Sequence, residues 1–152
     1  MLQLNLPAYA HQLRSEAGKL QIFDPIRKKY IHLTPEEWVR QHLLNLLTNE
    51  LKYPASRTKV EGGLTYNLRA KRTDILIYDE HMKPLVLAEC KAPHVELTER
   101  TIEQLALYNK VHQADLLILS NGIQTLAYLA SGKAGTQMLQ QIPTYNQLLE
   151  LR

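Results

Sequence analysis

The spacing of apolar side chains along the chain predicts a short hairpin followed by a long amphipathic helix. Residues 19–23 and 29–33 alternate apolar and polar positions around the turn residues Asp24-Pro25, as two paired strands do. From Trp38 to Leu51, apolar residues return at helical spacing and stop before Pro54. The first residues of the chain show neither pattern, so we expect them to form an irregular arm.

The helix has a clear start signal. Thr34 is suited to cap it, Pro35 to fill its first position, and Glu37 to complete a capping box by reaching back to the cap. The apolar stripe that follows has to be covered by another element, and we expect that element to be a sheet.

Further along the chain, apolar runs predict the strands of that sheet. Such runs, bounded by turn residues, occupy residues 75–78, 84–88, 115–120 and 124–129. The last two are joined by Asn121-Gly122, a common hairpin signal. A weaker strand, residues 59–66, is interrupted by Gly62-Gly63 and would pair with the strand that begins near Asp74.

A second helix separates the two groups of strands. Thr98 is its expected cap, and apolar residues at helical spacing extend it to about Val111, while residues 142–149 suggest a short closing helix. The order of helix, three strands, helix and two strands predicts a three-layer α/β fold, with a mixed central sheet flanked by helices and an N-terminal hairpin. We interpret residues 1–152 as one domain with its core at about 34–130.

Composition says more about where the protein is located in the cell than about its activity. No apolar run is long enough to cross a membrane and no basic, apolar leader opens the sequence, so we expect a soluble, cytoplasmic protein without a membrane partner. The single cysteine, Cys90, agrees with a reducing compartment. A formal net charge of +3 permits a polyanionic partner but does not require one.

Two acids and a base stand at the ends of two predicted strands. Asp74 precedes the first strand, while Glu89 and Lys91 end the second, on the same face of the sheet. Burying unpaired carboxylates is costly, so this grouping indicates mutual ion pairing, a metal ion, or both. Because buried ion pairs are weak stabilisers, we favour a functional site over a purely structural cluster. Cys90 points to the opposite face, as a small core residue rather than a nucleophile.

The spacing of these residues resembles a known signature. Asp74, Glu89 and Lys91 match the D-(x)n-(D/E)-x-K pattern of the PD-(D/E)xK phosphodiesterase superfamily, although Thr73 stands where the name-giving proline often lies.

A second match comes from the following helix. Gln104-x-x-x-Tyr108 resembles the Q-x-x-x-Y element of RecB-type nucleases and of the N-terminal nuclease domain of type I restriction enzyme R subunits. Tyr108 also has the spacing of an ordinary core residue. Most of residues 30–130 are similar to the R-subunit family, including Glu89-Cys90-Lys91-Ala92-Pro93 and Ser120-Asn121-Gly122.

The resemblance implies a restriction-endonuclease-like fold and a site for Mg²⁺, with Mn²⁺ as a possible substitute. Asp74, Glu89 and the backbone carbonyl of Cys90 would hold the ion, which agrees with the preference of Mg²⁺ for a few oxygen ligands plus water. Lys91 would orient or activate the attacking water and offset phosphate charge. Gln104 and Tyr108 would position the lysine, the acid or the nucleic-acid backbone.

Other residues have a functional and a plain interpretation. Glu37 would serve as the extra acid of the first helix, although its capping role already explains it, and Glu61 is another candidate acid. Positive side chains just before the first acid would contact phosphates, or would only solvate an edge: Arg57, Lys59, Arg69, Lys71 and Arg72.

Together these features predict a Mg²⁺-dependent endonuclease that acts on DNA. The pair Gly132-Lys133 lacks the context of a phosphate-binding loop, so we expect a stand-alone module without a motor, acting with protein partners of a restriction or repair complex. The alternative is a catalytically silent nucleic-acid-binding or assembly module of the same fold. A plain α/β interaction domain is a third possibility.

Overall fold

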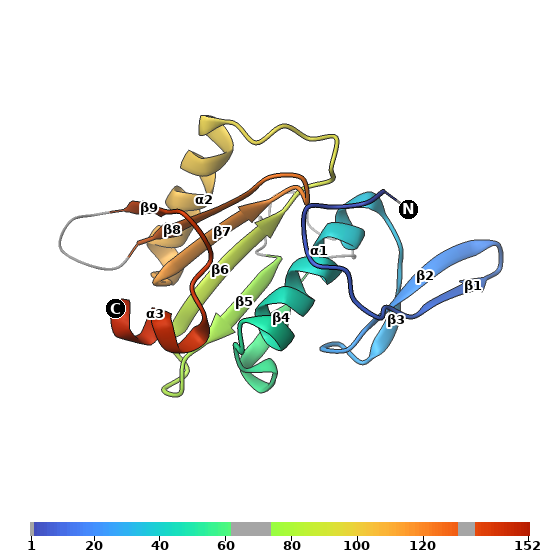
Figure 1. Ribbon diagram of the computed structural model, residues 1–152, viewed down its shortest axis with the longest axis horizontal. Helices are drawn as coiled ribbons and strands as arrows, with labels where there is room; N and C mark the ends of the chain where they lie inside the picture. Colours follow the sequence, from blue (N-terminus) through green and yellow to red (C-terminus); the bar gives the residue numbers. More distant parts are fainter. Residues whose placement is uncertain (1, 62–73, 131–135) are drawn as a thin grey trace.

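The computed structural model describes residues 2–61, 74–130 and 136–152, and Figure 1 shows how their strands and helices are arranged. The strands are β1 (Leu13–Glu16), β2 (Lys19–Asp24), β3 (Lys29–His32), β4 (Thr58–Val60), β5 (Ile75–Tyr78), β6 (Pro84–Cys90), β7 (Leu116–Ser120), β8 (Thr125–Leu129) and β9 (Gln137–Leu139). The α-helices are α1 (Pro35–Asn45), α2 (Glu99–His112) and α3 (Tyr145–Leu151), and a π-helical turn (Leu46–Glu50) and a 3-10 turn (Ala55–Arg57) follow α1. None of the helices in these ranges has the length and apolar character needed to span a bilayer.

The described strands form two sheets. A small antiparallel sheet has the order β1-β2-β3, and the central sheet has the order β4-β5-β6-β7-β8-β9. In the central sheet β6 and β7 run parallel, while every other pair of neighbours runs antiparallel. A parallel pair needs a long crossover connection, which α2 supplies. The predicted mixed sheet and N-terminal hairpin are therefore confirmed, with β1 as an added third strand of the hairpin sheet.

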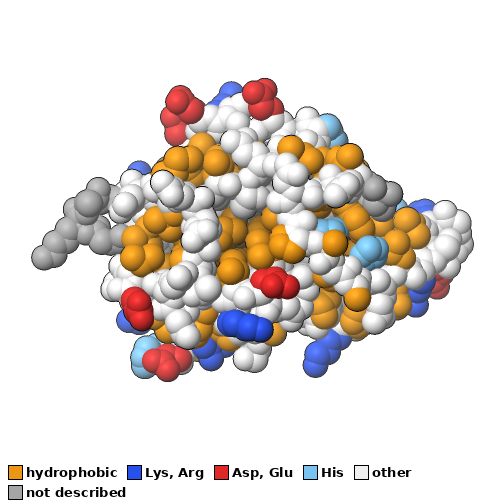
Figure 2. Space-filling model, in the orientation of Figure 1, with side chains coloured by type: hydrophobic (Ala, Val, Ile, Leu, Met, Phe, Trp, Pro, Cys, Tyr) orange, Lys and Arg blue, Asp and Glu red, His pale blue; other side chains and the backbone are white. Residues whose placement is uncertain are grey.

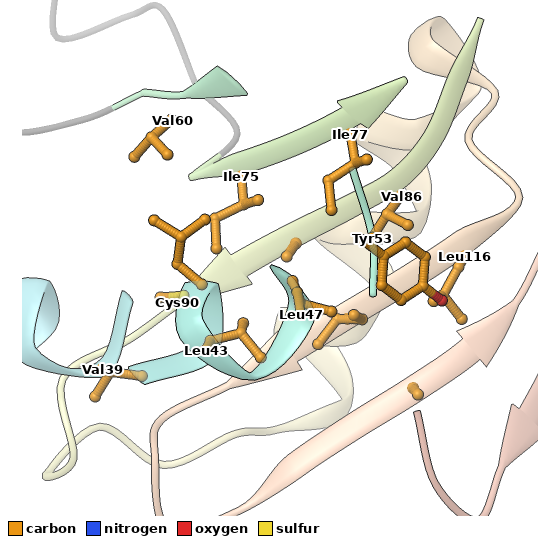
Figure 3. Close-up of a cluster of buried hydrophobic side chains, with 14 of the residues drawn as sticks. Val39, Leu43, Leu47, Tyr53, Val60, Ile75, Ile77, Val86, Cys90 and Leu116 are labelled. Atoms are coloured by element: carbon orange, nitrogen blue, oxygen red, sulfur yellow. The ribbon is translucent and has the colours of Figure 1, made fainter. Parts of the chain in front are cut away.

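Helices cover both faces of the central sheet. Side chains along β5 and β6 alternate between the two faces, so each face presents apolar side chains to a helix. Ile75 and Cys90 pack in one core cluster with the apolar side chains of α1 and with Leu148 of α3. Figure 3 shows the side chains of α1 turned toward those of β5 and β6. Leu76 packs on the other face, in a second cluster with Leu105 of α2. This arrangement confirms the predicted three layers.

The N-terminal arm and the small sheet lie beside α1 and help to bury it. Every residue of α1 from 37 to 44 is buried. The indole N–H of Trp38 donates to the carbonyl of Leu2 (2.8 Å), and the backbone N–H of Asn5 donates to the carbonyl of Gly122 (2.7 Å). The arm has little regular structure, as expected, but it ties α1 to the turn between β7 and β8.

Two strands and one helix start differ from the sequence prediction. β1 and β9 are mostly exposed and carry little apolar alternation, so they are formed by pairing with β2 and β8 rather than by burial. α3 begins at Tyr145 because Thr144 and Gln147 form a capping box there. Of the predicted strand 59–66, the part after Glu61 lies outside the described residues.

We expect the two glycines with left-handed backbone to respond differently to alanine. Gly122 has a φ of +84°, and a Cβ at this position would lie 2.7 Å from Cδ2 of Leu4, in the arm. Gly18 has a φ of +78° with no neighbouring atom within 4 Å. Both substitutions strain the backbone by about 1 kcal/mol, but only Gly122→Ala must also displace the arm. Urea denaturation should therefore show an additional loss of about 1 kcal/mol or more for Gly122→Ala, and equal losses would show that the arm adapts freely.

Asp79 predicts a loss of stability in acid. Its Oδ1 accepts the backbone N–H groups of His81 (2.8 Å) and Lys83 (2.9 Å), and its Oδ2 accepts from Arg152 (2.9 Å). Burial raises the pKa of Asp79, but these donors outweigh it and lower the pKa to about 2. A depressed carboxyl pKa stabilises the fold above its ordinary pKa, so this contribution should fade as the pH falls from near 4 toward 2.

The test is urea denaturation of Asp79→Asn across that pH range. At neutral pH the variant should lose about 1–2 kcal/mol, because a charge-assisted hydrogen bond to Arg152 is weakened. Its free energy of unfolding should also vary less than that of the native chain below pH 4. Glu80→Gln, at an exposed neighbour, is the control, and a similar pH response in Asp79→Asn and the native chain would contradict the assignment.

Candidate active site

Asp74 lies at the end of β5 where three strands of the central sheet meet. Ile75 pairs with Ala88 of the antiparallel β6, so the next step of the ladder sets Asp74 opposite Glu89. The backbone N–H of Cys90 donates to Oδ2 of Asp74 (2.6 Å). The backbone carbonyl of Asp74 accepts a hydrogen bond from the backbone N–H of Glu61, the residue that follows β4 (3.0 Å). Both the backbone and the carboxylate of Asp74 are therefore fixed by neighbouring strands.

Glu89 and Lys91 lie at the same end of the sheet. Glu89 is buried, Lys91 is half-buried, and Nζ of Lys91 lies 3.7 Å from Oε1 of Glu89. The backbone N–H of Lys91 donates to the carbonyl of Ser120 (2.8 Å), which continues the pairing of β6 with β7 beyond the strand end. The structure thus brings Asp74, Glu89 and Lys91 together at one edge.

Helix α1 adds a buried arginine to this edge. Nη2 of Arg40 lies 2.6 Å from Oδ1 of Asp74 and 3.0 Å from Oε2 of Glu36, while Nη1 lies 2.7 Å from Oε1 of Glu37. The Arg40 side chain is only 3% exposed, whereas that of Glu36 is 45% exposed. Glu36 is therefore the acid of α1 at the solvent-facing side of the cluster.

The charged cluster continues from Glu37 to the small N-terminal sheet. Arg27 donates to Oδ2 of the fully buried Asp24 (2.6 Å) and to Oε2 of Glu37 (3.2 Å). The side-chain amide of Gln41 donates to the same two carboxylates, at 3.0 and 2.9 Å. Buried ionised groups need partners of this kind, and here they join the hairpin sheet to α1 and then to Asp74.

Ion pairs connect the charged side chains of this cluster. Among the residues that the structure describes, they pair the carboxylates of Asp24, Glu36, Glu37, Asp74 and Glu89 with the cationic side chains of Arg27, Arg40 and Lys91. At the solvent-facing side, Glu36 and Asp74 both bond to a single nitrogen of Arg40.

The surroundings shift the pKa values of this cluster. Burial raises the pKa of Asp74, against the opposing effects of Arg40, the Cys90 N–H and Lys91. Burial and then the charge of Asp74 raise the pKa of Glu36. Burial lowers the pKa of Arg40, but Asp74 and Glu37 raise it well above its ordinary value, so the guanidinium stays charged.

Glu37 does not occupy the position expected from its capping signal. Thr34 accepts the Glu37 backbone N–H (3.0 Å), which confirms the cap. The Glu37 carboxylate, however, turns inward to Arg40, Arg27 and Gln41, because these donors satisfy a buried charge better than one backbone N–H. It is enclosed on the inner side of the cluster.

Sequence reasoning missed Arg40 and Glu36. Their spacing of four residues, and the spacing of three from Glu37 to Arg40, is that of ion pairs along a helix. The same spacing is ordinary on solvated helices. These residues form a buried network here because the N-terminal arm and the small sheet pack against α1.

The other candidate residues lie farther from this edge or have other partners. Gln104 is exposed on α2, and no described hydrogen bond joins it to Asp74, Glu89 or Lys91. Tyr108 is half-buried against the second core cluster, with its ring 5.0 Å from that of His112.

Glu61 follows β4 close to the candidate edge. Its backbone N–H is the donor to the Asp74 carbonyl, but its carboxylate lies 3.1 Å from Nζ of Lys59. Glu61 therefore neighbours Asp74 through its backbone while its charge is balanced locally.

The basic candidates do not form one surface in the described residues. Arg57 lies at the opposite end of β5 from Asp74, where it donates to the Tyr78 carbonyl (3.2 Å) and the Tyr145 hydroxyl (3.0 Å). Lys59 is exposed. Figure 2 shows Lys and Arg side chains spread over its face rather than gathered. Three further candidates lie outside the described residues: Arg69, Lys71 and Arg72.

The donor set at the edge suits a hard divalent cation without enclosing one. In the described ranges no three His, Cys, Asp or Glu side chains are grouped closely enough to hold a metal ion by themselves. Asp74 and Glu89 supply two carboxylates that stand opposite each other where β5 and β6 meet this edge. Mg²⁺ commonly uses one or two protein carboxylates and fills its remaining positions with water and phosphate oxygens. The arrangement fits such a partial site better than a closed metal cage.

Comparison with known protein families identifies one family for most of this chain. A family model described as the type I restriction enzyme R protein N terminus matches residues 35–143. A solved fragment described as an HsdR subunit of a type I restriction enzyme from Vibrio vulnificus YJ016 aligns at 21% identity with a TM-score of 0.43. The alignment covers 62% of this chain and 18% of that one, so the chain spans less than a fifth of that structure. No curated protein matches the chain.

The position of Cys90 predicts an inert thiol. Its side chain is 1% exposed among the apolar residues between α1 and the sheet, and burial, followed by the charge of Asp74, raises its pKa well above the ordinary value. We expect no reaction with a thiol-specific chromogenic reagent in the native protein at pH 8, and one equivalent after unfolding in guanidinium. Rapid reaction of the folded chain would show that the edge opens.

Proposed function

The chain belongs to the type I restriction enzyme R protein N-terminal family, and we propose that it is a Mg²⁺-dependent nuclease domain that cleaves DNA. One observation carries the proposal: Asp74, Glu89 and Lys91, from two different strands, meet at one edge of the central sheet. Carboxylates paired with a lysine at a solvent-facing edge are the groups that metal-assisted phosphodiester hydrolysis needs, and a structural ion pair has no need of this placement.

Asp74 and Glu89 would hold the ion, together with the backbone carbonyl of Cys90. When bound, Mg²⁺ or its substitute Mn²⁺ would neutralise the negative charge that develops on the phosphate oxygens. Asp74 is already oriented by the Cys90 N–H and by Arg40, so its side chain would lose little conformational freedom when the ion binds.

Lys91 would act on the substrate side. Its ammonium group lies beside Glu89, which holds it near the edge while leaving the side chain 32% exposed. From there it would orient the attacking water and offset phosphate charge. The further acid from α1 would be Glu36 rather than Glu37, since Glu36 faces solvent next to Asp74.

The helix and the basic residues would contribute to DNA binding. Gln104 is exposed on α2, which favours contact with the nucleic-acid backbone over contact with Lys91, and Tyr108 lies one turn further along the same helix. Lys59, Arg69, Lys71 and Arg72 stay proposed phosphate contacts. Arg57 is the weakest of these candidates, because its guanidinium is already used at the far end of the sheet.

Protein partners of a restriction or repair complex would supply what the domain lacks. The chain corresponds to a small part of the R-subunit structure it matches. We propose that it acts in the cytoplasm, as a nuclease module beside partner chains that find or move along DNA.

A catalytically silent nucleic-acid-binding or assembly module is the second candidate. It is favoured by the state of Asp74, because both carboxylate oxygens accept hydrogen bonds from the protein itself, from Arg40 and from Cys90. A domain that used Asp74 only as a structural anchor would bind DNA in a salt-sensitive way, independent of chelator.

Purified protein should nick or cut DNA with Mg²⁺ or Mn²⁺ and stop when the ion is chelated. Asp74→Asn and Lys91→Ala should each lower the cleavage rate by about 100-fold or more, because they remove an ion ligand and a group beside the attacking water. Rates are to be measured by gel on supercoiled and linear substrates, with circular dichroism to verify folding.

The matched controls are Glu80→Gln and Lys83→Ala, at the opposite end of β5 and β6. Both residues are exposed in that turn, so these variants should cleave like the native chain. If the Asp74 and Lys91 variants cleaved DNA at the rate of the native chain, the nuclease assignment would be refuted. Chelator-independent DNA binding without cleavage in any metal would support the silent module instead.

A further inference from the structure

Arg40 makes an unusual set of contacts for a residue in the middle of a buried helix. A single nitrogen, Nη2, lies 2.6 Å from Oδ1 of Asp74 and 3.0 Å from Oε2 of Glu36. The two carboxylate oxygens therefore cannot be farther apart than the sum of these distances. They come from helix α1 and from the start of β5, which no other described side chain joins in this way.

The guanidinium is also fixed from its inner side. Nη1 donates to Oε1 of Glu37 (2.7 Å), and Glu37 is held in turn by Arg27 and Gln41. Because the guanidinium is planar, a fixed Nη1 determines where Nη2 points. A lysine in this place would keep the charge but would have only one nitrogen for all three acids.

Stability alone does not explain Arg40. Replacing buried ion pairs by apolar side chains is often neutral or stabilising, and the neighbouring buried positions of α1 include Val39 and Leu43. In addition, Nε of Arg40 is buried without a hydrogen-bond partner among the described residues, which carries a cost. The residue is better explained by the placement it imposes on the two acids at the edge.

We propose that Arg40 is a positioning residue that sets Glu36 beside Asp74, so that both carboxylates face one divalent cation. This inference rests on the proposed function. Arg40 lies on the enclosed side of the two acids, and the partly exposed Glu36 leaves the solvent side as the approach for the ion. Arg40 contacts neither the ion nor the DNA and acts only through the two carboxylates.

The test compares Arg40→Lys with Arg152→Lys. Both variants keep the charge and alter a described ion-pair network, but Arg152 pairs with Asp79 and Asp115, and Asp79 follows β5 at the end opposite Asp74. Binding of Mn²⁺ is measured by calorimetry without DNA, and folding by thermal denaturation. Arg40→Lys should weaken Mn²⁺ binding by about tenfold or more, as loss of residues that orient metal ligands does. Arg152→Lys should change it by less than about twofold, even where both variants melt at lower temperature.

The outcomes separate the inference from the proposed function. Native affinity in a folded Arg40→Lys variant, or equal losses in both variants, would overturn the positioning role while leaving the nuclease proposal intact. A native chain that binds no divalent cation would overturn the proposed function and the inference with it.

A second measurement serves if Arg40→Lys does not fold. A crystal of the native chain soaked in Mn²⁺ should show the ion shared by Asp74 and Glu36, with Arg40 still bonded to both. An ion bound at Asp74 with Glu36 turned away, or with Arg40 displaced, would overturn the inference.

Discussion

The arrangement of the candidate edge depends on the ion pair between Arg40 and Asp74. Asp74 stands next to the first residue of β5 and Arg40 in the middle of α1, so this contact joins the helix directly to the sheet. A charge pair enclosed to this degree is stable only when the remaining oxygens and N–H groups also find partners. The Cys90 N–H, Glu36, Glu37, Gln41 and Arg27 supply them, and the small N-terminal sheet thereby becomes part of the support of the site.

This support explains why the peripheral hairpin matters to the rest of the molecule. Asp24 ends β2 and is fully buried, with its carboxylate bonded to Arg27 and Gln41. A displacement of the small sheet would remove two of the donors that hold Glu37, and Glu37 holds Arg40. The hairpin thus acts on the edge through a chain of ionic contacts, although it lies at one end of the molecule (Figure 1).

The sequence predicts those parts of the structure that burial of apolar surface decides. The strands β5, β6 and β7 are nearly continuous apolar runs, and the cap of α1 is set by Thr34, so local patterns suffice there. The grouping of Asp74 with Glu89 and Lys91 follows from the same strands. Arg40 and Glu36 were not foreseen, because a charged residue on a helix normally faces water and only a distant segment encloses it here. β1 and β9 escape prediction for a related reason, since pairing with a neighbour forms them without an apolar face.

The attachment of the N-terminal arm has an optical consequence. Trp38 is the only tryptophan of the chain, its indole N–H is bonded to the Leu2 carbonyl, and its ring lies 4.3 Å from that of His42. Burial lowers the pKa of His42, so this imidazole stays uncharged near neutral pH and its effect on the indole is constant there. The tryptophan fluorescence of the protein therefore comes from one ring held under the arm, and its emission wavelength reports whether the arm is bound to α1.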